Sequence, residues 1–306
     1  MGEGGALSLA PAAVAEALRY ACIVDVQAFK PGNVSLASPG HGMRAEDFIA
    51  SAEAAAAVMA APGLRVGQRI LRGLEATRQV VTFNTNLGIV LLCAPLVHAA
   101  VEPAQERRLR ARLQAVLAEL SVDDARDTYQ AIRLARPGGL GNSARHDVSA
   151  PPAVTLLEAM REARSRDRIA WQYASGFEDI FEVGSAVGRE ALARWGDGAW
   201  AAVSIYLEFL ARHPDSHIAR KHGEEMAGAV TQEARGPARV LRTAAHPSDA
   251  MPLLESFDRS LKARSLNPGT SADLTVATLL TLSLEDLLDK VYHGKQAAIG
   301  AGEPAA

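Results

Sequence analysis

The stretch from Asn84 to Leu96 constrains the fold of this chain more than any other. It joins a polar opening, Asn84-Thr85-Asn86, to the most apolar run in the sequence. A run with so few polar positions has to be covered on all sides, and a helix start presents unpaired backbone N–H groups to a ligand. The stretch therefore predicts a central buried helix whose start faces a ligand.

Elsewhere, Pro and Gly residues that break helices are separated by segments of typical helix length. The alternation of apolar and polar residues that is typical of β-strands is almost absent. This pattern predicts an all-α fold, a single compact bundle of roughly ten helices. We expect one domain over residues 1–294 and a flexible tail at 295–306. Besides the opening stretch, helices are expected at 8–29, 45–61, 66–82, 105–120, 123–135, 155–173, 177–195, 199–212, 217–231, 251–264 and 272–288. Ser8 is the candidate N-cap of the first, and Gly236-Pro237 is expected to be a connection.

Charge and composition exclude several classes of partner. The chain has 306 residues, 48% of them apolar, with a net charge of -3 and a pI near 6.3. Such a chain can bury a sizeable core and has no global basic field, so we expect no nucleic-acid binding. The apolar run ends too soon to cross a bilayer, and no basic region precedes the first apolar residues, so neither a membrane span nor a secretory signal is expected.

The two cysteines, Cys22 and Cys93, lie in apolar runs. A free thiol in such a run packs as a small hydrophobic group, which fits a reducing, cytoplasmic location. The expected helices carry more apolar surface than the sequence allows us to pair, which leaves room for a homo-oligomer.

Four loops have a similar composition, in which glycine or a helix start is combined with Asn, Asp, Ser or Lys. They are Lys30–Asn33, Asn84–Gly88, Pro137–Gly141 with the nearby Asp147, and Asn267–Asp273. Helix starts and glycines suit phosphates, and Asp or Asn oxygens can hold a hydrated Mg²⁺. Each loop alone can also be explained by residues that end or cap helices. None has the spacing of a Walker phosphate-binding loop or of the dinucleotide-binding GxGxxG motif. Their recurrence favours phosphorylated small-molecule substrates.

Two other patterns have simpler interpretations. His213, His217 and His222 suggest a zinc site, but no cysteine lies near them and Pro214-Asp215-Ser216 is typical of a capped helix start. The arginine-rich segment 158–168 is typical of a solvated helix face with i,i+4 pairs. Neither pattern is preferred as a site.

The order of these motifs resembles one known family. The residues that carry the resemblance are Asp25, Lys30-Pro31-Gly32-Asn33, His41-x-Met43, Asn84-Thr85-Asn86-Leu87-Gly88, Pro137-Gly138-Gly139-Leu140-Gly141 and Pro268-Gly269-Thr270-Ser271-Ala272-Asp273. In this order, from about Ala21 to Leu282, they resemble the triphosphoribosyl-dephospho-CoA synthase family.

The resemblance implies an all-helical transferase that uses ATP and Mg²⁺. The namesake reaction joins the ribose carbon of ATP to a hydroxyl of 3′-dephospho-CoA and releases adenine. By resemblance, Lys30 and the Gly32-Asn33 loop would contact phosphate. The further candidate substrate- or phosphate-binding residues are His41, Gly138, Gly139, Gly141 and Ser271. Asn84, Thr85, Asn86 and Gly88 would line the nucleotide pocket, and Asp273 would help to hold the metal.

The chain also departs from the namesake pattern. Where that branch reads Lys-Pro-Gly-Leu-Val-Asp, His-x-Asp-Met and Asn-Thr-His-Lys-Gly, this chain reads Lys30-Pro31-Gly32-Asn33-Val34-Ser35, His41-Gly42-Met43 and Asn84-Thr85-Asn86-Leu87-Gly88. Two acids and one cation are lost. The variant resembles a branch of archaea and methylotrophic bacteria that includes enzymes of methanofuran-type coenzyme synthesis. Those enzymes join an aminomethylfuran-methyl diphosphate to a tyramine phenol and release diphosphate.

Both chemistries need a metal, cations for the phosphates and a carboxylate to take a proton. The candidate catalytic residues are therefore Asp25, Lys30, Asp147 and Asp273, with Asp147 and Asp273 as the candidate Mg²⁺ ligands. A helical protein that binds a phosphorylated coenzyme without turnover remains the alternative from another class.

Overall fold

The regular secondary structure of the described part of the chain is helical. The computed structural model describes residues 6–139 and 145–300, and within them β-structure is limited to the isolated bridges Leu7–Ala104 and Gly40–Met43. The elements, in order, are α1 (Pro11–Gln27), α2 (Ala45–Met59), α3 (Val66–Val80), α4 (Leu87–Val101), α5 (Leu109–Ala118), α6 (Val122–Ala135), α7 (Leu156–Ala163), α8 (Arg168–Ser175), η1 (Asp179–Gly184), α9 (Ser185–Trp195), α10 (Gly198–Arg212), α11 (Ser216–His222), α12 (Glu224–Thr243), η2 (Pro247–Ala250), α13 (Met251–Ala263) and α14 (Gly269–Gly300). The predicted all-α class is confirmed.

Helix α4 is the buried centre of the bundle, as the opening stretch predicted. Every residue from Leu87 to Val101 is buried except His98, which is half-buried. Helices α1, α3, α5, α6, α8 and α14 all contact it. The apolar character of α4 therefore follows from its being enclosed by neighbouring helices. Among the described residues, no helix is long and apolar enough to span a membrane.

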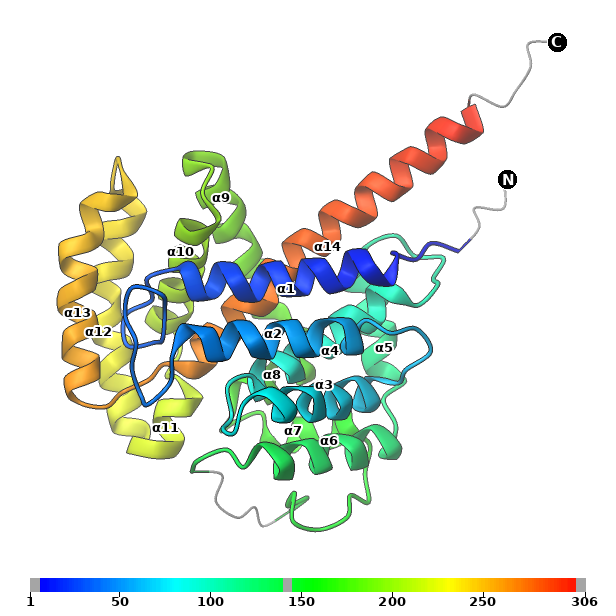
Figure 1. The fold of residues 1–306 in the computed structure, drawn as a ribbon, viewed down its shortest axis with the longest axis horizontal. Coiled ribbons are helices and arrows are strands. Elements are labelled where there is room, and N and C mark those ends of the chain that lie inside the picture. The colour runs from blue at the N-terminus through cyan, green and yellow to red at the C-terminus, as the bar shows by residue number, and fades with distance from the viewer. Residues whose placement is uncertain (1–5, 140–144, 301–306) are drawn as a thin grey trace.

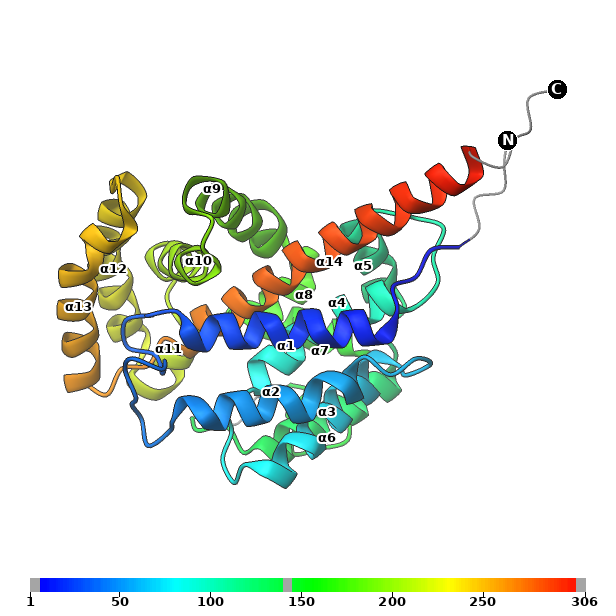
Figure 2. The ribbon, with the colours of Figure 1, turned by 45° about the horizontal axis from the view of Figure 1, so that its top comes forward.

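The other helices are arranged around α4 and α14. Helices α1 and α2 run side by side, with α3 packed next to α2 and α6 packed next to α3 (Figure 1). Helix α14 starts inside the bundle, passes α1, α4 and α10, and then projects beyond the other helices in both views (Figure 2). Helices α12 and α13 lie at the opposite end, close to where α14 begins.

The structure divides two helices that the sequence analysis expected to be continuous. The segment 155–173 forms α7 and α8, because the Asp167 carboxylate caps α8 by accepting from the N–H groups of Ile169 and Ala170 at 2.9 and 3.1 Å. The segment 217–231 is divided at Gly223, whose φ of 90° ends α11. These two divisions account for the difference between the twelve helices expected by residue range and the fourteen α-helices of the described residues.

Other expected boundaries also differ. The first helix begins at Pro11 after Ala10, so Ser8 is not its N-cap. Gly236 and Pro237 lie inside α12, where the buried Ala234, Ala238 and Leu241 pack in the apolar core, and this packing outweighs the helix-breaking tendency of proline. Helix α14 continues to Gly300, beyond its expected end at Leu288, and residues 301–306 of the expected tail lie outside the described residues.

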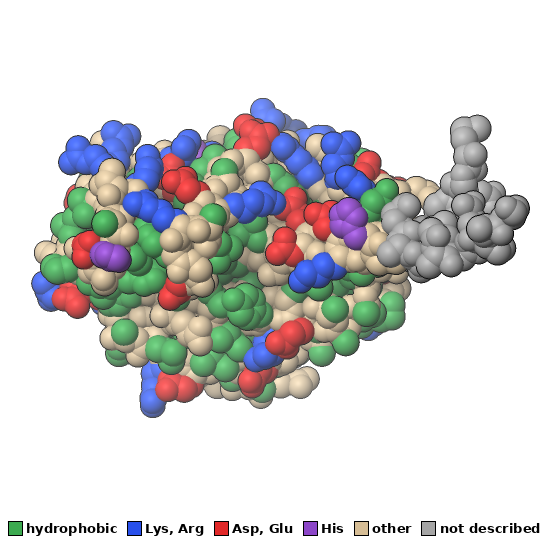
Figure 3. Space-filling view, turned by 90° about the horizontal axis from the view of Figure 1, so that it is seen from above, with side chains coloured by type: hydrophobic (Ala, Val, Ile, Leu, Met, Phe, Trp, Pro, Cys, Tyr) green, Lys and Arg blue, Asp and Glu red, His purple; other side chains and the backbone are tan. Residues whose placement is uncertain are grey.

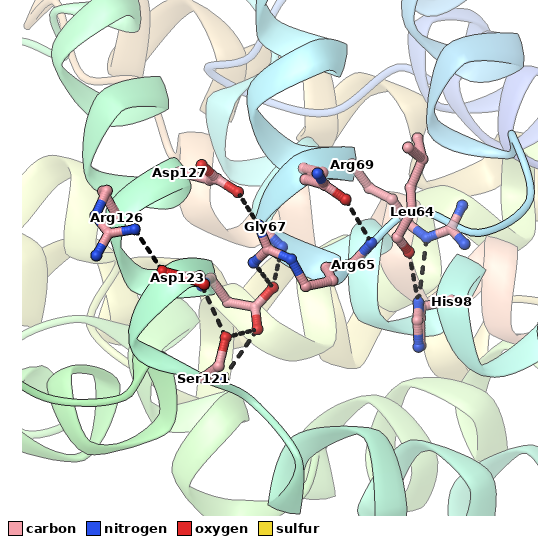
Figure 4. A network of polar contacts seen from close by, with 11 residues as sticks. Leu64, Arg65, Gly67, Arg69, His98, Ser121, Asp123, Arg126 and Asp127 are labelled. Carbon is pink, nitrogen blue, oxygen red and sulfur yellow. Dashed lines mark hydrogen bonds and ion pairs between the residues drawn. The ribbon is translucent and has the colours of Figure 1, made fainter.

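A buried arginine joins the ends of α2, α3 and α4. The Arg69 side chain is fully buried, and its Nη1 donates to the carbonyl oxygens of Met59 and Ala61, both at 2.6 Å. Its Nη2 donates to Glu102 Oε1 at 2.7 Å, and its Nε lies 3.3 Å from His98 Nδ1. Figure 4 shows Arg69 in this network beside Leu64 and His98. Carbonyls at the end of α2 that would otherwise lack partners are therefore satisfied by a charged group.

The same network continues to α6. Arg65 pairs with Asp127 at 3.0 Å, and the Gly67 N–H donates to Asp124 Oδ1 at 2.8 Å (Figure 4). A Cβ at Gly67 would lie 2.6 Å from the Asp124 Cα, so α3 and α6 approach each other closely only because residue 67 is glycine. This fixes α6, which forms one wall of the cavity described below.

We predict that Arg69→Ala lowers the free energy of unfolding by about 3 kcal/mol, because it leaves two carbonyls and one carboxylate without their buried partner. Urea denaturation monitored by circular dichroism measures this loss. The control is Arg19→Ala, which removes an exposed pair with Glu16 and should cost less than about 0.5 kcal/mol. Similar losses for both variants would contradict the structural role of Arg69.

Candidate functional site

A cavity of about 360 Å³ lies between the starts of α4 and α14, the helices α6, α7 and α8, the loop before α7, and α11. Its apolar wall includes Leu87, Leu91, Ile132, Leu156, Met160 and Ile169. Its basic side chains are Arg145, His146, Arg166, His217 and Arg220, and its acidic ones are Asp147, Asp167, Glu224 and Asp273. The cavity thus combines an apolar wall with a charged one.

The structure brings three of the four predicted loops to this cavity. Asn84 and Gly88 from the start of α4, Gly138 and Asp147 from the loop after α6, and Asp273 from α14 all line it. Asn84 also accepts from the Leu87 N–H at 3.0 Å through its Oδ1, so its side chain holds the start of α4. Residues separated by almost two hundred positions in the sequence therefore meet in one place.

Asp273 lies against the backbone of α4. A Cβ at Gly88 would be 1.9 Å from Asp273 Oδ2, so only glycine fits beneath this carboxylate. Within the described residues, no hydrogen bond or ion pair engages the Asp273 carboxylate. Burial raises its pKa well above the ordinary value, and the nearby Asp215 and Asp25 add to the shift. This carboxyl group is therefore poised to accept a proton or to bind a cation.

Asp25 and Lys30 form a buried ion pair outside the cavity. The Lys30 side chain is 0% exposed, that of Asp25 is 7% exposed, and Lys30 Nζ also donates to the Asp25 backbone oxygen at 2.8 Å. Burial raises the pKa of Asp25 and lowers that of Lys30, while their mutual attraction opposes both shifts. The Lys30 ammonium group is thus paired with Asp25, and Lys30 does not line the cavity.

The loop that contains Gly32, Asn33 and His41 is held by contacts within the protein. The Gly32 N–H donates to Asp258 Oδ1 at 2.8 Å, and His41 Nε2 donates to the Gly32 carbonyl at 2.8 Å. Asn33 Nδ2 donates to Asn267 Oδ1 at 2.9 Å. Gly32 has a φ of 80°, and a Cβ there would meet Leu261 at 2.7 Å. These predicted phosphate-binding residues do not line the cavity.

The remaining predicted residues also serve internal contacts. Thr85 Oγ1 lies 2.6 Å from Ser51 Oγ, and Asn86 Nδ2 donates to Thr77 Oγ1 at 2.9 Å. The Ser271 N–H and hydroxyl donate to Asp215 Oδ2 at 2.7 and 2.8 Å. Gly139, with a φ of 74°, packs on the Arg220 carbonyl. Gly141 lies outside the described residues.

Sequence reasoning missed the two polar cavity residues on α11, His217 and Arg220. Burial lowers the pKa of His217 to about 3, and the neighbouring Lys221 and Arg220 add to the shift, so the imidazole is neutral at ordinary pH. The signal that could have identified them is their i,i+3 spacing directly after the capping Asp215, which places both on one helix face.

The three histidines do not gather into a zinc site in the described part of the chain. His213 contacts Arg168 and Asp179, His217 lines the cavity, and His222 is exposed. No group of three or more His, Cys, Asp or Glu side chains able to hold a metal occurs among the residues that the structure describes.

Comparison with known proteins identifies the family. Residues 11–292 match the family model described as CitG: ATP:dephospho-CoA triphosphoribosyl transferase. The chain belongs to this family. The match covers all the motifs that carried the resemblance from Asp25 to Asp273, and so the predicted family is confirmed.

Two further comparisons agree with the CitG family. A curated relative, the 2-(5''-triphosphoribosyl)-3'-dephosphocoenzyme-A synthase of Pectobacterium atrosepticum, is 31% identical over 107 residues, or 35% of this chain and 33% of the relative. The chain thus matches about a third of that relative's length. A crystal structure described as a triphosphoribosyl-dephospho-CoA synthase of Archaeoglobus fulgidus has a TM-score of 0.58 at 23% identity, covering 77% of this chain and 98% of that one. This likeness shows a shared fold.

For this CitG-family cavity we predict that Gly88→Ala lowers the free energy of unfolding by about 2 kcal/mol, because the new methyl group overlaps the Asp273 carboxylate. In an Asp273→Ala background the same change should cost less than about 1 kcal/mol, since the overlapping atoms are gone. Urea denaturation of the four proteins measures the coupling. An equal cost in both backgrounds would show that residues 88 and 273 do not meet.

We also predict a pH effect from His217. Its folded pKa of about 3 lies below the unfolded value near 6.5, so the unfolded chain binds a proton that the folded one does not. The stability linked to neutral His217 is fully present above pH 6.5 and is lost as the pH falls toward 3. Between pH 7 and pH 5 the wild type should lose about 2 kcal/mol more than His217→Gln. Equal losses, measured by urea denaturation at each pH, would contradict the buried, neutral imidazole.

Proposed function

We propose that this chain is a Mg²⁺-dependent transferase that moves a group from a phosphate-bearing donor to a hydroxyl acceptor. The observation that carries the proposal is the Asp273 carboxylate, which faces a cavity lined by arginines and has no partner among the described residues. A carboxylate with a raised pKa suits the removal of a proton from a hydroxyl group, and arginines suit phosphates. The family match supports this class of reaction.

The charges of the cavity support a need for metal. Three arginines face four acidic side chains, Asp147, Asp167, Glu224 and Asp273, so the lining carries one net negative charge when all are ionised. Such a lining would repel a polyphosphate, and one divalent cation would reverse the sign. Asp147 would hold Mg²⁺, whose remaining positions would be filled by water and substrate phosphate, as Mg²⁺ prefers, and Asp273 would stay free to act as the base. The ion would neutralise charge on the leaving phosphate.

The protein groups have separable tasks in the proposed reaction. The acceptor oxygen forms a bond to the donor carbon, the bond between that carbon and its leaving group breaks, and Asp273 takes the hydroxyl proton. The Asp147 carboxylate is oriented by Ser149, whose N–H and hydroxyl donate to Oδ1 at 2.8 and 2.5 Å. The apolar wall of the cavity, which includes Leu87 and Ile169, would exclude water from the reacting carbon.

One observation favours the methanofuran-type alternative over the namesake substrates. Leu87 lines the cavity at the position where the namesake branch carries a lysine, so a cation for phosphate is replaced by an apolar side chain. A cavity of about 360 Å³ is also at the lower end of the range for small-molecule sites. An aminomethylfuran-methyl diphosphate with a tyramine phenol fits these properties better than ATP with dephospho-CoA.

A cytoplasmic location is part of the proposal. The two cysteines are free and buried, as expected in a reducing compartment. Acidic and basic side chains are interspersed on the face seen from above (Figure 3), which does not favour nucleic acid as a partner.

The test is to incubate the protein with Mg²⁺ and either ATP with 3′-dephospho-CoA or the furan diphosphate with tyramine. We expect diphosphate release in the second mixture, whereas adenine in the first would support the namesake reaction. Neither product would favour the binding protein without turnover. Asp273→Ala should lower turnover by about 100-fold or more, while Asp286→Ala, an exposed acid on the same helix, should leave it unchanged.

A further inference from the structure

Two nitrogen atoms on α11 lack partners at the edge of the cavity. His217 and Arg220 both line it, and His217 Nε2 and Arg220 Nε are buried without a hydrogen-bond partner among the described residues. The two side chains are three positions apart, so they lie on the same face of the helix. Buried nitrogen atoms without a hydrogen-bond partner are rare in folded proteins, and two on one face indicate that something else completes their hydrogen bonding.

Arg220 is held in place by an acidic residue that also caps a helix. Its Nη1 donates to Asp167 Oδ2 at 2.8 Å, and the other oxygen of Asp167 caps α8. Each of the two side chains is 26% exposed. One edge of the guanidinium is thus fixed by Asp167, which pre-organises the group as a planar fork suited to phosphate oxygens.

The backbone that carries these residues is fixed from two sides. Asp215 caps α11 and also accepts from Ser271 at the start of α14, and Gly139 packs directly on the Arg220 carbonyl. Arg220 also lies close enough to Asp273 to oppose the rise of its pKa. The α11 face is therefore held at a set position relative to Asp273.

We propose that His217 and Arg220 form the phosphate-binding face of the cavity, and that Asp167 is the positioning residue for Arg220. The ligand group is a diphosphate or a terminal phosphate of the substrate. Arg220 supplies the charge, and the neutral imidazole supplies a hydrogen bond. The role of this face in turnover rests on the proposed function, but phosphate binding itself does not.

The experiment measures binding of inorganic pyrophosphate to the full-length protein by isothermal titration calorimetry in buffer with MgCl₂. Arg220→Gln should weaken binding about tenfold to a hundredfold, and His217→Ala about threefold. The matched control is Lys221→Gln, which removes the same charge from the neighbouring, exposed position of α11 and should change affinity less than about twofold. Circular dichroism confirms that each variant keeps its helix content.

A double-mutant cycle tests the role of Asp167. Asp167→Asn keeps an oxygen to cap α8 and removes the charge that holds Arg220, so it should weaken binding in the wild type and have little effect in the Arg220→Gln background. A merely structural role would give the same effect in both backgrounds and would overturn the positioning assignment.

Three results would overturn the phosphate-binding face. These are wild-type protein that does not bind pyrophosphate, Arg220→Gln with unchanged affinity, and Lys221→Gln with a loss as large as that of Arg220→Gln. Failure of the transferase assay with Arg220-dependent pyrophosphate binding would instead reject only the proposed reaction.

Discussion

The arrangement of the site depends on the hydrogen bonds that the Asp215 carboxylate accepts. It accepts from the backbone N–H groups of His217 and Ile218 at 2.9 and 3.2 Å and from the N–H and hydroxyl of Ser271 at 2.7 and 2.8 Å. Burial raises its pKa, and the four donated hydrogen bonds oppose that rise. This one side chain ties the start of α11 to the start of α14. The positions of the α11 face and of Asp273 are consequently set together.

The motif Lys30–Asn33 is held by contacts within the protein. Lys30 is paired with Asp25 in the interior, and the following loop is held by Asp258 and Asn267 on distant parts of the chain. This buried layer lies close enough to Asp273 for Asp25 to raise its pKa and for Asp273 to raise that of Lys30. The motif therefore shapes the electrostatic environment of the cavity without facing it.

The fold class and the central helix were readable from the sequence, because apolar periodicity and helix breakers are local signals. The convergence of Gly88, Asp147 and Asp273 was anticipated through their shared loop chemistry. The division of 155–173 was missed because it depends on Asp167 capping a helix that pattern alone does not separate, and Pro237 was misread because packing against the core outweighs its local preference. His217 and Arg220 were missed because their role depends on a cavity formed by segments distant in sequence.

The apolar residue Leu87 links selectivity to stability. It is buried to 8% exposure at the first position of the central helix and also forms part of the cavity wall. A lysine at this position would place a charge in an apolar wall, where it is costly until a phosphate pairs with it. Family members with that lysine should gain more stability on binding substrate than this chain does. A single position of the core can thus affect both which ligand the cavity accepts and how much ligand binding stabilises the protein.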